Sequence, residues 1–444
     1  MSRLLAGAGK ADIRYTPEML PTFGENYNAI HDLPMIQVLL LECGERFTVI
    51  SVDAVMLEIR DRLLSAAEEE LGLDRRNILL HATHVLATPH FREWSGVEEW
   101  MADPGHSRAA VTEADAARFT AGENLLVQAH VDALRSACRQ AVKTLQRATF
   151  GLGTAHADVT VNRVVKTRNG WWQGVNPEGP TDQAVPVLRF DGADGKAIAL
   201  LYNVNVAPGC MEFSQVNGGR MVSGDLAGAS ERFVDRVFGE NVVSIYTTGA
   251  TGDQWQALRA RVDYLDREGD QVITDLGEQG FALVEVLATR LGEQVVHTAD
   301  QIQTRPVEGP VTLDRFTFTY PGQRVETSAG WNDPTNDCRF IAEGQQRAEA
   351  AVLVIGDTAI AACGVELCVE SLKKIKEGSP FAQTVLMEFA AEGGGYMPPE
   401  IFYDRMSFQA RKCRYAKGSA ERFTEDVIQS LNKIYQTHNR LEKE

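Results

Sequence analysis

The sequence has 444 residues, of which 44% are hydrophobic and 24% charged, a composition typical of a globular protein with a large buried core. It excludes a disordered or fibrous protein, and no apolar run approaches the roughly 18 residues of a membrane-spanning helix. The 61 acidic and 44 basic residues give a net charge of −17, which argues against nucleic acid and anionic membranes as partners. The expected partner is a small-molecule substrate, and a homo-oligomer is left open.

The sequence carries no targeting or disulfide pattern. The first residues contain only a short apolar stretch, shorter than a signal peptide requires. The seven cysteines are odd in number and scattered, and the CGVELC spacing of Cys363 and Cys368 is neither a zinc-knuckle nor a redox motif. We therefore predict a cytoplasmic protein whose cysteines are reduced and mostly buried.

From the N-terminus onward, apolar strand-like runs alternate with amphipathic helical patterns. The strand-like runs cover residues 36–43, 47–55, 77–82, 197–206, 241–248 and 350–356, and the helical patterns cover residues 57–71, 112–146, 224–238, 269–293 and 419–435. Apolar strands between helices are typical of an α/β protein whose sheets are covered on both faces. Residues 304–335 alternate between polar and apolar side chains, which predicts an antiparallel hairpin. We expect one large mixed α/β domain over residues 1–444, with residues 300–345 as an excursion; two closely packed lobes would give the same pattern.

Three histidines follow the predicted strand at residues 77–82. The segment NILLHATHVLATPHF contains His81, His84 and His90, and loops at strand ends are where α/β proteins place functional groups. His81 and His84 are three positions apart, so on a strand they face opposite sides and could share a metal only if the strand ends between them. For His84, a hydrogen-bonded loop histidine is the commoner role and a metal ligand is the alternative.

Acidic residues stand in three further segments near strand ends. Asp225 lies in SGDLAG, Asp253 in TTGATGDQW and Glu366 in ACGVELCVE. The glycines before Asp253 allow a ligand to approach the backbone closely, although the segment lacks the lysine of a nucleotide-binding P-loop. Asp253 could equally bond to backbone amides of a tight turn, and Glu366 could cap the helix that follows it.

The order of these motifs along the chain closely resembles the neutral/alkaline ceramidase family. The resemblance extends over about residues 5–436 and rests on AGAGKADI, IHDLP, VISVDAV, LLHATHVLATP, VNRV, VSGDLAG, GATGD, GVE and GYMPPE. It implies the mixed α/β fold of that family's catalytic part, without the immunoglobulin-like tail or membrane anchor of longer members. It also implies an amide hydrolase in which zinc polarises the carbonyl group and a water molecule.

In that family, two histidines, a glutamate and a tyrosine hold the zinc ion. The resemblance places the first histidine at His84 and the glutamate at Glu366, while the second histidine falls on Ala207 and the tyrosine on Phe408. Since zinc prefers about four ligands, the implied site is incomplete unless other residues substitute. The candidate substitutes are His31, His81, His90, His106, Asp53, Asp225 and Asp253.

Three functions stay open at this point. The first is a ceramidase-like hydrolase of an amide or related bond in a small soluble substrate, with His84 or Glu366 as general base and Arg163, of the VNRV motif, orienting the substrate. The second is a carbohydrate-processing enzyme that uses paired carboxylates without zinc. The third is a binding protein that has lost catalysis. For the first function, we expect His84 and Glu366 to meet in one cleft. The expected catalytic residues are His84, Glu366 and Asp253, and the expected substrate-binding residues are Arg163, Asp225, Trp255 and His31.

Overall fold

The largest sheet of the protein has eight strands in the order β12-β10-β9-β6-β1-β3-β4-β5. The structure, a computed structural model, describes residues 4–20, 22, 25–102, 111–239, 241–265, 270–307, 311–330, 333–391 and 394–441. The strands of this sheet are β1 (Leu5–Asp12), β3 (Met35–Cys43), β4 (Glu45–Val52), β5 (Ile78–Ala82), β6 (Gln146–His156), β9 (Ala184–Gly192), β10 (Ala197–Val204) and β12 (Val243–Thr248). Its pairs are antiparallel except β4–β5 and β10–β12, so the sheet is mixed.

A second sheet has four strands, in the order β16-β17-β18-β19. They are β16 (Val311–Glu326), β17 (Arg339–Ile355), β18 (Thr358–Cys363) and β19 (Gln383–Met387). β16 and β17 form a long antiparallel hairpin. The hairpin predicted at residues 304–335 is thus correct in type but not in extent, because only β16 lies in that range and the second strand, β17, begins at Arg339. The excursion expected at residues 300–345 is therefore part of this sheet, because the hairpin continues through β17 into β18.

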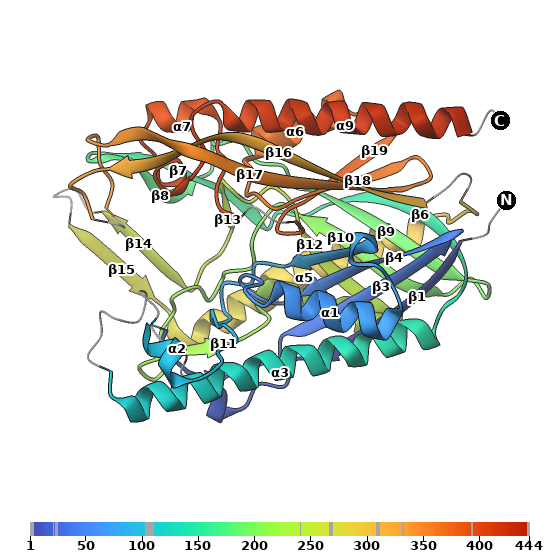
Figure 1. The fold of residues 1–444 in the computed structure, drawn as a ribbon, viewed down its shortest axis with the longest axis horizontal. Helices are drawn as coiled ribbons and strands as arrows, with labels where there is room; N and C mark the ends of the chain where they lie inside the picture. The colour runs from blue at the N-terminus through green and yellow to red at the C-terminus, as the bar shows by residue number, and fades with distance from the viewer. Residues whose placement is uncertain are drawn as a thin grey trace.

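The two sheets pack face to face between two layers of helices (Figure 1). Leu39 and Leu41 of β3 share one buried cluster with Leu353 of β17 and Ile360 of β18. The helices α1 (Arg60–Leu71), α3 (Glu113–Lys143), α4 (Asp225–Phe238) and α5 (Gly280–Gln301) cover the outer face of the large sheet, and α6 (Val369–Gly378) and α9 (Ser419–Leu441) cover that of the second sheet. The prediction of a mixed α/β protein is confirmed. Each sheet, however, is covered by helices on one face and by the other sheet on its second face. The sequence did not indicate this, because an apolar strand face shows that it is buried but not what covers it.

The helical pattern at residues 269–293 is only partly a helix. Residues Gln271–Asp275 form strand β15, which pairs with β14 (Arg261–Leu265), and α5 begins at Gly280. The β-branched Val272 and Ile273 favour the hairpin over a helical turn. The other helical predictions fall on α1, α3, α4 and α9, and none of the described helices is long and apolar enough to cross a membrane.

Small sheets and short helices stand at one end of the two large sheets (left in Figure 1). β7 (Thr160–Thr167), β8 (Gly170–Asn176) and β13 (Gln254–Gln256) form a three-stranded sheet beside the β14–β15 hairpin, and β2 (Tyr27–Ile30) pairs with β11 (Arg220–Val222). The short helices are α2 (Val97–Ala102), α7 (Glu400–Asp404) and α8 (Phe408–Lys412). This end carries the candidate site described next. All seven cysteines are buried and none forms a disulfide bond, in agreement with the prediction.

Candidate functional site

A cavity of about 360 Å³ opens at this end of the molecule. Segments far apart in the sequence line it: the loops after β5, β12 and β18, the hairpin β7–β8, strand β13 and helix α8. Its walls are His84, Leu86, Arg163, Trp172, Gln173, Ala207, Gly209, Glu212, Phe213, Thr251, Gln254, Trp255, Gln256, Arg259, Asp263, Gln271, Glu366, Tyr396 and Phe408. The fold thus brings His84 and Glu366 to one cavity, as the sequence analysis expects.

His84 lies in the loop that follows β5. Its backbone adopts a left-handed conformation, with φ of 58°, which costs energy for a residue other than glycine and fixes the ring's direction. Nδ1 lies 2.5 Å from the Val55 carbonyl oxygen, and the ring stacks on Phe389 with 4.2 Å between centroids. A carbonyl only accepts hydrogen bonds, so Nδ1 carries the proton and Nε2 keeps a lone pair. Burial lowers the pKa of His84 to about 4, so the ring is neutral at pH 7.

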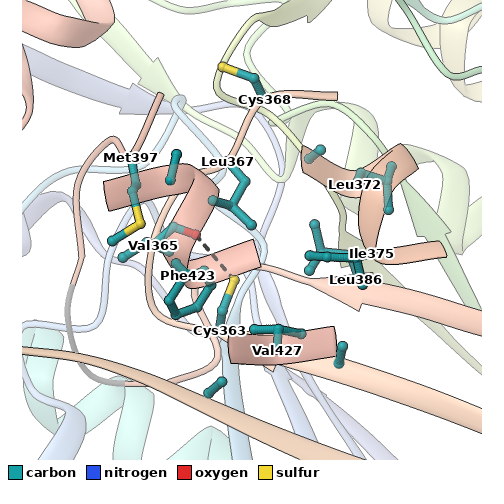
Figure 2. Packing of buried hydrophobic residues seen from close by; sticks show 14 of the residues in the cluster. Cys363, Val365, Leu367, Cys368, Leu372, Ile375, Leu386, Met397, Phe423 and Val427 are labelled. Atoms are coloured by element: carbon teal, nitrogen blue, oxygen red, sulfur yellow. Dashed lines mark hydrogen bonds between the residues drawn. The ribbon is translucent and has the colours of Figure 1, made fainter. Parts of the chain in front are cut away.

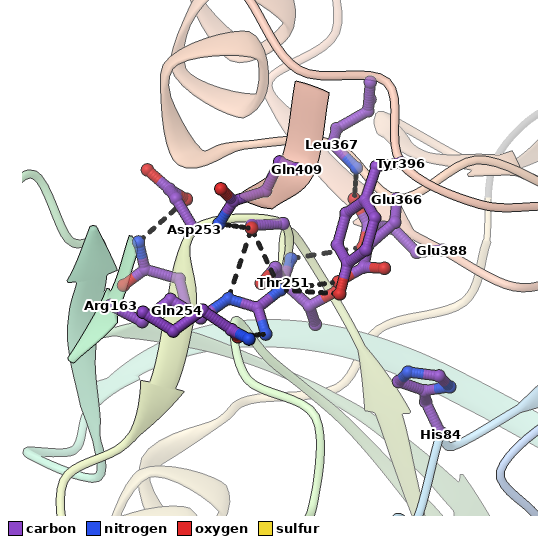
Figure 3. A network of polar contacts seen from close by, with 12 residues as sticks. His84, Arg163, Thr251, Asp253, Gln254, Glu366, Leu367, Glu388, Tyr396 and Gln409 are labelled. Carbon is purple, nitrogen blue, oxygen red and sulfur yellow. Dashed lines mark hydrogen bonds and ion pairs between the residues drawn. The ribbon is translucent and has the colours of Figure 1, made fainter. Parts of the chain in front are cut away.

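Arg163, Glu366 and Tyr396 form a buried polar network in the cavity wall (Figure 3). Arg163 Nη2 donates to Glu366 Oε1 at 3.1 Å, to the Tyr396 hydroxyl at 3.0 Å and to the Gly252 carbonyl at 3.0 Å. Arg163 and Glu366 are only 6% and 5% exposed. Burial raises the pKa of Glu366 to about 7, although the neighbouring Arg163 acts to lower it. Glu366 therefore exchanges a proton near neutral pH.

The backbone around Glu366 explains its fixed position. Val365 and Leu367, on either side of it, are fully buried in the apolar cluster beneath α6 and α9 (Figure 2). Glu366 also pairs through its backbone with the segment around Tyr396, since its N–H donates to the Gly395 carbonyl at 3.0 Å. At Gly252 any side chain would collide with the Leu367 backbone, 2.8 Å from the place of a Cβ atom. The glycine therefore allows its carbonyl to reach Arg163.

A second buried carboxyl group, Glu388, lies behind Glu366. It accepts hydrogen bonds from the Thr251 backbone and hydroxyl at 3.1 and 2.8 Å and from the Leu367 backbone at 2.6 Å. Burial, and then the charge of Glu366, raises the pKa of Glu388 well above its usual range. Through these three hydrogen bonds Glu388 holds together the two loops that carry Thr251 and Glu366.

Aromatic side chains form the remaining wall of the cavity. Phe408 meets Trp172 and Tyr396 edge-to-face, with centroid distances of 5.2 and 5.7 Å. Trp255 lies under the Arg259 guanidinium at 3.9 Å, and Arg259 pairs with Glu212 at 2.7 Å. Trp255 thus lines the cavity as expected of a substrate-binding residue, and the wall offers flat apolar faces beside polar groups.

Three of the expected site residues do not line the cavity. Asp253 accepts from the Val369 backbone at the start of α6 at 3.0 Å and from Asn162 and Gln254. The structure therefore supports the alternative in which Asp253 bonds to backbone amides.

Asp225 and His31 are likewise engaged elsewhere. Asp225 is fully buried and accepts from the backbones of Cys210, Met211 and Leu226. His31 stacks on Phe281 at 3.5 Å and bonds to Asp32. Position at a strand end indicates that a residue is near an edge, but it does not fix the direction of the side chain.

Comparison with known proteins identifies the fold. No family model matches the sequence, and no curated protein matches it. Among solved structures, the neutral ceramidase from Pseudomonas aeruginosa matches with a TM-score of 0.70 and 15% identity, over 96% of this chain and 74% of that one. The protein has a ceramidase-like fold. A ceramidase complexed with C2 matches with a TM-score of 0.69 and 14% identity, over the same shares of the two chains.

The donors of this cavity do not fit a zinc site. Across the part of the chain that the structure describes, no three His, Cys, Asp or Glu side chains converge to hold a metal ion. Ala207 lines the cavity without a donor atom, and Arg163 occupies both Glu366 and Tyr396 with a fixed positive charge. The positive charge of Arg163 repels a metal cation at the same place.

The candidate substitute ligands are not available to the cavity either. His81 bonds to Ser51 through Nδ1 at 3.1 Å and to the Thr248 backbone through Nε2 at 3.2 Å, and His90 bonds to Glu58 at 2.6 Å. Asp53 accepts from the Met35 backbone and from Thr83. His106 lies outside the described residues.

Sequence reasoning missed Tyr396 and Glu388. The resemblance placed the family's tyrosine on Phe408, yet it is Tyr396 whose hydroxyl lies in the network with Glu366, so a phenolic oxygen is present. The sequence feature that could have indicated Tyr396 is the GGGYMPPE segment, in which three glycines precede the tyrosine. Gln409, the residue after Phe408, donates to the Gly252 carbonyl at 2.9 Å and supports the loop that Arg163 contacts.

Proposed function

We propose that the protein is a hydrolase that cleaves an amide or related acyl bond of a small polar substrate. One observation carries this proposal: a single cavity holds the neutral His84, whose Nε2 has a lone pair, and Glu366, whose pKa is about 7. At neutral pH His84 is unprotonated and can accept a proton, and Glu366 can supply one; amide hydrolysis needs these two proton transfers. The ceramidase-like fold supports the same class of reaction.

In the proposed reaction His84 Nε2 removes a proton from a water molecule, and the water oxygen bonds to the carbonyl carbon. Negative charge develops on the carbonyl oxygen, where Arg163 and the Tyr396 hydroxyl supply hydrogen bonds. The C–N bond then breaks, and its electron pair stays with the nitrogen, which takes the proton of Glu366. The proton on His84 returns to Glu366, and a carboxylic acid and an amine leave.

A carbohydrate-processing enzyme is the second candidate, supported by the aromatic wall of Trp172, Trp255 and Phe408. Rings of this kind stack on sugar faces. Glycosidic chemistry needs paired carboxylates. Of the three acidic residues near predicted strand ends, Asp225 and Asp253 bond to backbone amides outside the cavity, and only Glu366 lines it. The geometry therefore supports the binding of a hydroxylated substrate, but it does not supply the carboxylate pair of a glycosidase.

A panel of N-acyl amines and nitrophenyl glycosides tests these functions, with release of amine or nitrophenol as the readout. We expect amine release, with a loss of about 100-fold or more in His84→Ala and in Glu366→Gln. His31→Ala is the matched control, because His31 is a histidine outside the cavity. Glycoside cleavage alone would favour the second candidate. Ligand binding without cleavage of either class would favour the third, a binding protein.

A further inference from the structure

A groove adjoins the cavity that contains His84 and Glu366. It has a volume of about 710 Å³ and lies between the β7–β8 hairpin, the β14–β15 hairpin and residues 333–334. The two spaces share four lining residues, Trp172, Gln173, Asp263 and Gln271. A ligand longer than the cavity would therefore extend across these four residues into the groove.

The lining of the groove is polar and of mixed charge. Its polar side chains are Lys166, Thr167, Arg168, Asn169, Gln173, Asp263, Asp270, Gln271 and Asp333, and the rings of Trp172 and Tyr264 supply flat apolar surface. An acyl chain would cover these polar groups without bonding to them, which is unfavourable. An anion would meet three carboxylates against two cations. A neutral ligand with many hydroxyl groups can both donate to the carboxylates and accept from the amide and basic groups.

The side chains at the junction of the two spaces contact one another and Arg163. Trp172 is wedged between the edge of Phe408, at 5.2 Å, and the Arg411 guanidinium, at 5.5 Å. The Gln173 carbonyl oxygen accepts from Arg163 Nη1 at 3.2 Å, so the orientation of its amide is set. Among the described residues no partner accepts from Gln173 Nε2, which leaves this nitrogen able to donate to a ligand hydroxyl.

We propose that this groove, which we call the sugar groove, binds a polyhydroxylated, sugar-like portion of the substrate. The substrate class is then an N-acylated amino sugar that carries a further sugar unit. Its acyl–nitrogen bond lies beside Glu366, and the further unit lies on Trp172 among the polar side chains. The reaction assigned to this substrate rests on the proposed function, whereas the binding of the sugar does not.

The experiment compares N-acetylglucosamine with its β-1,4-linked disaccharide as probes. Amine release gives kcat/KM for each, and calorimetry on Glu366→Gln gives the dissociation constant of each without turnover. We expect the disaccharide to exceed the monosaccharide at least about tenfold in both measurements, since stacking on one aromatic ring and two or three hydrogen bonds supply that difference.

Trp172→Leu should bring this ratio close to one. Trp171→Leu is the matched control, because Trp171 is the adjacent tryptophan on β8, stacks on Arg405 at 4.2 Å and lines neither space. Asp333→Asn, in the groove but outside the cavity, should lower the ratio less. Thermal unfolding shows whether each variant is folded.

The two proposals fail in different ways. Amide cleavage without a preference for the disaccharide, or with equal losses in Trp172→Leu and Trp171→Leu, would overturn the sugar groove and leave the hydrolase. Disaccharide binding that Trp172→Leu weakens, without cleavage of any amide, would support the groove and overturn the hydrolase.

Discussion

Replacement of Glu366 by glutamine tests the protonation state that the proposed reaction requires. Burial raises the pKa of this carboxyl group from an ordinary value of 4.5 to about 7. Between these two pH values the folded protein keeps a proton that the unfolded chain releases, so the free energy of unfolding falls as the pH rises. Glutamine has the shape of the protonated acid and does not ionise. The variant therefore lacks this part of the pH dependence.

The size of the effect follows from the two pKa values. One pKa unit corresponds to 1.36 kcal/mol. The rise of the Glu366 pKa to about 7 therefore lowers the free energy of unfolding of the wild type by about 3 kcal/mol between pH 4 and pH 8. Other buried carboxyl groups, such as Asp53 with a pKa of about 7, have the same sign of effect. Asp53 is present in both proteins, and its contribution cancels in the difference. Glu388 does not cancel, because the charge of Glu366 raises its pKa; loss of that charge lowers the pKa of Glu388 and adds to the difference with the same sign. The free energy of unfolding of Glu366→Gln, relative to that of the wild type, should thus rise by about 3 kcal/mol between pH 4 and pH 8.

Urea unfolding followed by tryptophan fluorescence at pH 4, 5, 6, 7 and 8 measures this difference. Glu370→Gln is the control, because Glu370 is exposed on α6 and pairs with Lys374 at 2.8 Å. Its difference from the wild type should stay within about 0.5 kcal/mol over the whole range. A constant difference for Glu366→Gln would refute the reasoning, since it would mean that Arg163 keeps Glu366 ionised and that Glu366 cannot donate a proton.

The proton-transfer pair, the arginine and the alanine of the cavity each allow a further test. The pH profile of kcat/KM should be bell-shaped, with limbs near pH 4 for His84 and pH 7 for Glu366, and a rate that still rises above pH 8 would contradict these roles. Arg163→Lys should lower kcat/KM about tenfold or more, because one ammonium group cannot replace a guanidinium that contacts both Glu366 and Tyr396; unchanged kinetics would count against this. Ala207→His should raise zinc affinity in calorimetry about tenfold or more by adding an imidazole to the cavity wall, and equally tight binding by the wild type would show that the ligand assignment is wrong.

Much of the fold could be predicted because burial patterns are local. The runs at residues 36–43 and 197–206 are almost continuously apolar, and both form interior strands of the large sheet, β3 and β10. The face-to-face packing of two sheets could not be predicted, since a buried strand face has the same composition under a helix or under a sheet. The helix predicted from residue 269 begins at Gly280 in the structure. The prediction was too early because Val272 and Ile273 continue an apolar pattern that is compatible with a strand or a helix.

The candidate site could be predicted only in part, because sequence spacing does not fix side-chain direction. His84, Glu366 and Arg163 were found through matched motifs. Tyr396 was missed since its nearness to Glu366 arises from a backbone bridge between two loops, a contact that the sequence does not encode locally. Asp253 sits in a glycine-rich turn like a ligand-binding residue, but its oxygen accepts the first backbone N–H of α6.

The charge beside Glu366 decides which chemistry this cavity supports. Arg163 Nη2 lies 3.1 Å from the carboxylate and 3.0 Å from the Tyr396 hydroxyl, so a permanent cation occupies the two oxygen donors that could share a metal with His84. At Ala207, where the resemblance expects an imidazole, the wall is a methyl group. The cavity thus offers fewer metal ligands than the resemblance implies, and it holds a fixed positive charge. In the proposed reaction this charge stabilises the oxyanion, while His84 and Glu366 transfer the protons. We therefore infer that this ceramidase-like scaffold supports acid–base hydrolysis, with the guanidinium in the role of the electrophile.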